Sequence, residues 1–196
     1  MLKAGAAEKT REETAGGSDE DLVARIAAGD ERAFRDFAER YTGLIFSVAW
    51  RMSRSRAAAE DIVQETLLRL WQKAGDYDVK RGASVKTWLC RIATNLCIDE
   101  KRKGGREYGG ELPETADPSE GAQKTMETKE TGEIVGRVMQ ELPERQRSAL
   151  ILFHYEGMSV KEIAEVLQTT PKGAERLLDR SRQALRRGLE VYKGVL

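Results

Sequence analysis

The chain has 196 residues, of which 40% are hydrophobic and 34% charged, so it can form one domain or two small ones but not a large catalytic barrel. Its 33 basic and 33 acidic side chains cancel, which argues against a uniformly basic, histone-like protein. No apolar run approaches the roughly 20 residues that cross a bilayer, and the N-terminus has no apolar signal core. We therefore expect a cytoplasmic protein without direct membrane insertion.

Apolar spacing divides the chain into four segments. Residues 1–18 are polar and rich in Gly, Ala and Glu, which predicts a disordered arm. From 19 to 103 apolar residues recur at helical spacing, and no segment alternates like a strand. Residues 104–132 lack an apolar stripe and predict a flexible acidic linker, after which helical spacing resumes over 133–196. The predicted fold class is all-α, with two small helical domains joined by that linker.

In the first domain, the helix expected over 60–74 has a polar face. Ile62, Leu67, Leu70 and Trp71 can pack inward, while carboxylate and amide side chains remain outside. Such a patch suits docking onto a partner helix. Taken alone, the pattern is more typical of a solvated helix surface.

The next segment, 76–103, mixes aromatic and basic residues. Aromatic rings beside cations can hold unstacked bases, and stacking contributes about 1–3 kcal/mol per base, although a tryptophan such as Trp88, taken alone, is more often a core residue.

Cys90 and Cys97 lie seven residues apart on this helix, about 10.5 Å, which is too far for a mutual disulfide. With one histidine, His154, which we interpret as structural or on the surface, the chain offers no metal site. No catalytic set or phosphate-binding loop appears, so we expect no enzyme, no cofactor and no small-molecule substrate.

Charge is segregated along this neutral chain. Residues 84–103 have five basic and two acidic side chains, and residues 172–187 have six and two. Between them, residues 104–135 have three basic and eight acidic side chains. Each domain therefore contains one basic helix. Taken alone, such helices are more often ordinary solvated faces than binding sites.

The strongest local pattern is SVKEIAEVLQTTPKGAERLLDRSRQALRR, residues 159–187. Ser159 and Glu162 predict a capping box, while Thr170 and Pro171 predict the start of a second helix after a short turn. The second helix has an apolar inner face and a charged outer one. A helix, a tight turn and a basic second helix are typical of a helix-turn-helix, whose second helix enters the major groove. A plain helical hairpin is the alternative.

Five motifs together identify a family. They are D-x-x-Q-E at 61–65, S-x-x-T-W-L at 84–89, R-I-A-x-N at 91–95, L-P at 142–143 and the S-x-x-E-I-A helix-turn-helix. In this order and spacing, they resemble the two-domain bacterial sigma factors of the sigma-70 family, in the extracytoplasmic-function (ECF) group. The resemblance covers about residues 19–103 and 133–190.

This resemblance implies a sigma region 2-like domain over 19–103 and a sigma region 4-like domain over 133–196. In the family, the D-x-x-Q-E helix docks on the clamp helices of the largest polymerase subunit, which implies core-binding roles for Asp61, Gln64, Glu65 and Leu68. The following loop and helix read the minus-ten promoter element and help to melt it. The implied contacts there are Tyr77, Lys80, Arg81, Ser84, Lys86, Trp88, Arg91, Asn95, Lys101, Arg102 and Lys103.

The second domain is expected to sit on the polymerase flap and to read the minus-thirty-five element. Its implied DNA contacts are Thr170, Lys172, Glu175, Arg176, Asp179 and Arg180. The chain departs from many relatives here: Glu175 replaces a basic residue, which puts the promoter sequence in question, and Gly173 has no explanation from sequence alone.

The resemblance also implies an anti-sigma factor that holds the two domains shut. Two functions remain as alternatives. One is a helix-turn-helix regulator that binds DNA without polymerase, and the other is a helical protein-interaction adaptor.

Overall fold

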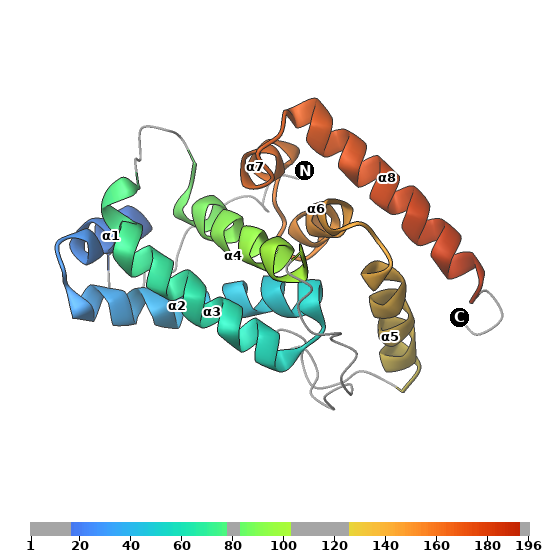
Figure 1. Ribbon diagram of the computed structural model, residues 1–196, viewed down its shortest axis with the longest axis horizontal. Coiled ribbons are helices and arrows are strands. Elements are labelled where there is room, and N and C mark those ends of the chain that lie inside the picture. Colours follow the sequence, from blue (N-terminus) through green and yellow to red (C-terminus); the bar gives the residue numbers. More distant parts are fainter. Residues whose placement is uncertain (1–16, 78–82, 103–125, 193–196) are drawn as a thin grey trace, which may run out of the picture.

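The computed structural model describes residues 17–77, 83–102 and 126–192 (Figure 1). Within these ranges the chain forms eight α-helices and one short 3₁₀ turn, and no strand, so the all-helical expectation is confirmed. Some expectations lie outside the described residues: the arm up to residue 16, the linker over 104–125, and the DNA contacts Lys80, Arg81 and Lys103.

Four helices form the first domain. They are α1 (Asp19–Ala27), α2 (Glu31–Ser53), α3 (Arg56–Lys73), which is followed by the 3₁₀ turn η1 (Ala74–Asp76), and α4 (Val85–Arg102). Each of the first three helices begins at a side-chain cap, respectively Ser18, Asp30 and Ser55. Their apolar stripes meet in one core that includes the fully buried Phe37, Ile45, Leu70 and Leu89.

The second domain contains α5 (Met126–Gln140), α6 (Glu144–His154), α7 (Val160–Val166) and α8 (Pro171–Glu190). Helix α5 begins six residues before the expected end of the linker at 132. Met, Glu and Lys in METKETG have high intrinsic helix propensity, so a helix forms there without an apolar stripe. Leu150, Ile151, Ile163 and Leu178 are among the core residues of this domain.

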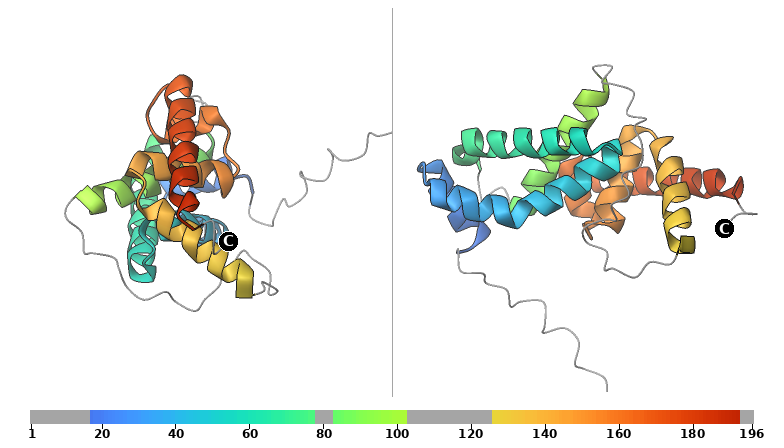
Figure 2. Two further views of the ribbon diagram at one scale, coloured as in Figure 1. Left: turned by 90° about the vertical axis from the view of Figure 1, so that its right-hand side faces the viewer. Right: turned by 90° about the horizontal axis from the view of Figure 1, so that it is seen from below.

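The two domains pack directly against each other. Helices α6 and α7 lie on α2 and α4, and α8 lies on the side of the second domain that is farther from α1 (Figures 1 and 2). Three buried residues of the first domain, Val48, Met52 and Cys90, belong to the core cluster of the second domain. The apolar core is therefore continuous across the domain boundary.

Candidate nucleic-acid interface

Local hydrogen bonds build the helix-turn-helix. Ser159 Oγ accepts a hydrogen bond from the Glu162 backbone N–H at 3.3 Å, and the Glu162 carboxylate accepts one from the Ser159 N–H at 2.8 Å. Ser159 Oγ also donates to the Glu162 carboxylate at 2.7 Å, and this hydrogen bond, together with the one from the Ser159 N–H, lowers the pKa of Glu162 because both favour its ionised form. The capping box expected at the start of α7 is therefore present.

The turn between α7 and α8 contains a feature that sequence reasoning missed. Gln168 has φ of 50°, in the left-handed region, although it is not a glycine. Directly after it, Thr169 N–H donates to Ala164 O at 2.9 Å, and Thr170 Oγ1 accepts from Gly173 N–H at 3.1 Å. The turn is thus closed by hydrogen bonds at both helix ends, with Pro171 in the first turn of α8.

Gly173 has a steric reason to be glycine. A Cβ atom there would overlap Thr169 Oγ1 and would lie 3.3 Å from Thr170 Oγ1. The absence of a side chain lets both threonines fold over the start of α8. Glycine therefore permits the threonine-capped turn, which accounts for the residue that the sequence left unexplained.

Helix α8 presents the expected outer face to solvent. Lys172, Glu175, Arg176, Asp179 and Arg180 are all exposed, whereas Ala174, Leu178 and Ser181 are buried. Asp179 lies 3.8 Å from Arg182, whose guanidinium also sits 5.0 Å from the Phe153 ring centroid. The face is predominantly basic, and Glu175 is an exposed hydrogen-bond acceptor near its start. This arrangement can present side chains to base edges and phosphates.

In the first domain, Tyr77, at the start of the loop before α4, packs against Trp88 in the first turn of that helix. Their ring centroids are 5.2 Å apart, and Tyr77 Oη donates to Ala83 O at 2.9 Å, which joins the two ends of this loop. Trp88 is only 8% exposed and belongs to the first core. In this conformation Trp88 therefore supports Tyr77 and offers no free ring face for a base.

Helix α4 separates the expected minus-ten residues onto two faces. At 3.6 residues per turn, Ser84, Trp88, Arg91, Asn95 and Arg102 lie along one stripe. Lys86 and Lys101 lie on the opposite stripe with Cys90 and Cys97, which packs against the second domain. Lys86 Nζ donates to Glu156 O at 2.6 Å, and Lys101 Nζ lies 3.4 Å from Glu144 Oε1. The structure therefore groups Arg91 and Asn95, both half-buried, and turns Lys86 and Lys101 toward the other domain.

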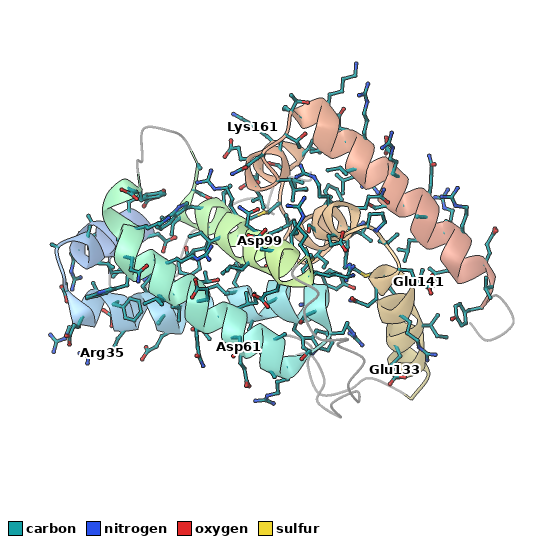
Figure 3. All side chains as sticks on the ribbon, viewed as in Figure 1. Arg35, Asp61, Asp99, Glu133, Glu141 and Lys161 are labelled. Carbon is teal, nitrogen blue, oxygen red and sulfur yellow. The ribbon has the colours of Figure 1, made fainter. Side chains whose placement is uncertain are left out.

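Helix α3 presents the expected polymerase-binding residues on one face. Asp61, Gln64 and Leu68 are exposed, and Figure 3 shows Asp61 pointing away from the molecule. Glu65 is half-exposed and pairs with Arg69 at 2.7 Å. Among the residues that the structure describes, Leu68, at 50% exposure, and Trp71, at 38%, are two of the few large apolar side chains left in solvent. Trp71 was expected to pack inward, and its ring does pack edge-to-face on Phe34 with the centroids 5.3 Å apart. The part of Trp71 that stays exposed forms an apolar centre with Leu68, which their spacing of three could have revealed.

Cys90 is buried and Cys97 is half-buried. Burial raises the pKa of both thiols to about 12, so they remain protonated at neutral pH.

Within the described ranges, no three His, Cys, Asp or Glu side chains group as metal ligands, and His154 is exposed. Among the described helices none is both long and apolar enough to pass through a bilayer.

Comparisons with known proteins agree with this arrangement. Residues 37–107 match the family Sigma-70 region 2, and residues 132–185 match Sigma-70, region 4. The chain is 30% identical to the ECF RNA polymerase sigma factor SigW of Bacillus subtilis, over 85% of this chain and 94% of that one. It is 31% identical to the RNA polymerase sigma-H factor of Pseudomonas aeruginosa, over 88% and 94% of the two chains.

Two solved structures share the fold. CnrH in complex with the cytosolic domain of CnrY aligns with a TM-score of 0.67 at 24% identity, over 88% of this chain and 97% of that one. The sigma factor RpoE in complex with the anti-sigma factor NepR from Bartonella quintana aligns with a TM-score of 0.61 at 24% identity, over 80% and 98%.

Proposed function

This chain belongs to the extracytoplasmic-function group of sigma-70 factors. From that membership we propose which of its surfaces acts in each part of promoter recognition. The protein joins core RNA polymerase, reads the minus-ten and minus-thirty-five promoter elements and helps to melt the DNA. It acts in the cytoplasm as a DNA-reading subunit without an enzymatic activity of its own.

The exposed basic face of α8 carries this proposal. Lys172, Arg176 and Arg180 are exposed on one side of a capped helix whose other side is buried in the second core. Such a helix fits the major groove, where its cations contact phosphates and guanines. Glu175 is the acceptor nearest the start of this face, and a cytosine amino group is the base-edge donor that matches it. The minus-thirty-five role of this face follows from its place in region 4.

For the minus-ten element, we assign the stripe of Arg91 and Asn95 together with the Tyr77 loop. An asparagine side chain both donates and accepts hydrogen bonds, so Asn95 can read a base edge, whereas Arg91 neutralises phosphate. Lys86 and Lys101 are DNA contacts only after they leave Glu156 and Glu144. Trp88 contributes by holding Tyr77 in place.

We assign the binding of core polymerase to the α3 face. Leu68 and Trp71 offer apolar area at its centre, and Asp61, Gln64 and Glu65 offer acceptors around it. An apolar centre with a polar rim is the usual anatomy of a protein interface. An anti-sigma protein is a further partner class, since the RpoE relative is solved with one.

Co-sedimentation of the full chain with bacterial core polymerase tests the proposal. We expect the wild type to bind and Asp61→Arg to bind at least about tenfold more weakly, because a long cation would replace an exposed acceptor at the proposed interface. Glu39→Arg is the matched control, since it makes the same charge change at an exposed position on α2. Absence of wild-type binding, with specific DNA binding by the free chain, would instead favour a polymerase-independent regulator.

A further inference from the structure

Helix α6 supports both helices of the helix-turn-helix. It packs against α7 and α8, and its buried side chains Leu150 and Ile151 share one core with Ile163 of α7 and Leu178 of α8. Apolar contacts hold helices together but have little directional preference. Hydrogen bonds are directional, so they are the contacts that can fix where α8 points its outer face.

The first directional contact holds the turn between α7 and α8. The last carbonyl groups of a helix have no partner within it. At the end of α7, Leu167 O accepts a hydrogen bond from Arg145 NH2 at 2.6 Å, and Arg145 lies in the first turn of α6. The next residue is Gln168, whose left-handed backbone conformation redirects the chain toward α8. A guanidinium from α6 therefore caps α7 at the point where the turn begins, at the negative end of the helix dipole.

The second directional contact holds α8 itself. Ser181 is 0% exposed on the inner face of α8, and its Oγ lies 2.8 Å from Gln146 O of α6 and 2.6 Å from Leu177 O of its own helix. A hydroxyl carries one proton, so the two carbonyl groups share this donor. A serine inside a helix can satisfy its hydroxyl on its own helix alone, as the distance to Leu177 O allows. The additional approach to Gln146 O ties α8 to α6.

The two contacts start from neighbouring residues of α6. Arg145 and Gln146 are consecutive, and they hold the two ends of the segment from Leu167 to Ser181. This segment contains the whole turn and the first three turns of α8, which carry the exposed face assigned to the minus-thirty-five element. One short stretch of α6 therefore holds the base-reading surface at both of its ends.

Small rotations of α8 matter at this surface. The side chains of a helix reach about 5–6 Å from its axis, so a rotation of about 10° moves their tips by about 1 Å. The N–H···O distances of hydrogen bonds span only about 0.5 Å. Base reading therefore requires that the rotation of α8 about its axis be held to within about 10°.

We propose that Arg145 and Ser181 are positioning residues for promoter recognition: their bonds to Leu167 O and Gln146 O fix the turn and the rotation of α8, and so determine how well the protein distinguishes its minus-thirty-five sequence from others. Both residues act through α8 and make no base contact themselves. This inference rests on the proposed function, because it concerns the base contacts assigned to α8.

Sequence discrimination by the complex with core polymerase, the holoenzyme, tests this role. One probe is a promoter duplex that wild-type holoenzyme selects from a library randomised over the minus-thirty-five element, and the other is the same duplex with that element scrambled. Arg145→Met removes the donor and keeps an aliphatic side chain, and Ser181→Ala removes the hydroxyl alone. We expect each variant to lower the ratio of the two affinities at least about fivefold, the smallest effect of losing one bidentate base contact. Affinity for the scrambled duplex should stay within about twofold, because phosphate contacts carry no sequence information.

Matched variants separate positioning from folding. Arg137→Met makes the same change at an exposed position of α5. Ser148→Ala removes a buried hydroxyl that donates within α6 itself, to Glu144 O at 2.7 Å. Both control variants should keep wild-type discrimination, and circular dichroism should show the same helix content in all four variants.

Each outcome decides the proposal. A lower affinity ratio for Arg145→Met and Ser181→Ala, with binding to the scrambled duplex preserved, supports it. Wild-type discrimination by either variant would remove that residue from the positioning role, and an equal loss on both duplexes would show that the bonds serve folding alone. If wild-type holoenzyme selects no sequence at the minus-thirty-five element, the function proposed for α8 is itself wrong, whatever the variants do.

Discussion

Replacing Gly188 by alanine tests the close crossing of α5 and α8. Glycine in a helix interior is usually unfavourable, and alanine at such a position stabilises a protein by about 0.5–1 kcal/mol. The structure predicts the opposite sign. A Cβ at Gly188 would overlap Val138 Cγ1 and would lie 3.5 Å from both Cβ and Cγ2 of Val138.

Rotation of the valine relieves this overlap only at a cost in energy. Cγ1 of Val138 is the overlapping atom, and a helical valine is confined mostly to one χ1 rotamer. Val138 is 3% exposed, so its backbone is held by the core. Overpacking of this kind costs about 1–3 kcal/mol. After the gain in helix propensity, we expect Gly188→Ala to lower the free energy of unfolding by about 1 kcal/mol.

Urea unfolding followed by circular dichroism measures the effect. Gly43→Ala is the matched control, because Gly43 lies exposed within α2 and a Cβ there would meet no atom within 4 Å. Gly43→Ala should stabilise, while Gly188→Ala should destabilise. In the double variant Val138→Ala, Gly188→Ala, the two effects should be less than additive. Stabilisation by Gly188→Ala equal to that of Gly43→Ala would show that α5 and α8 do not cross this closely.

Three further outcomes follow from the candidate sites. Arg176→Ala should remove footprint protection over the minus-thirty-five element and leave core binding unchanged, because Arg176 is exposed on α8; an unaltered footprint would contradict its assignment. Asn95→Ala should slow promoter opening, measured by permanganate reactivity, more than it weakens core binding, and an equal loss of both would remove Asn95 from base reading. Hydrogen bonds from Ser159 lower the folded-state pKa of Glu162, so this carboxylate stabilises the fold above its ordinary pKa of 4.5, and that contribution is lost as pH falls through the folded-state value. Glu162→Gln should therefore flatten the acid end of the stability–pH curve, and an unchanged curve would show that the capping box does not contribute.

The helical class was predicted from apolar spacing and is confirmed by the structure, and the family and its promoter-reading function were predicted from motifs and are confirmed by the comparisons. The roles of individual residues stay predictions. The exposure of the residues assigned on α3 and α8 fits their proposed roles. It could be predicted because helical periodicity alone determines which side chains share a face. On α4 the same rule was insufficient: Lys86 and Lys101 are basic like Arg91 but lie on the opposite stripe, against the second domain.

Local chemistry explains what the sequence alone determined. A capping box joins residues three apart, and a proline suits the first turn of a helix whatever surrounds it, so the helix-turn-helix was readable from Ser159 to Pro171. Contacts between distant segments have no such local signature. The capping of α2 by Arg147, the burial of Val48 in the second core and the approach of Gly188 to Val138 arise only when the helices pack. Tertiary structure decided these contacts. The type of an apolar or cationic side chain shows that it needs a partner, but only the packing of the whole chain determines which residue becomes that partner.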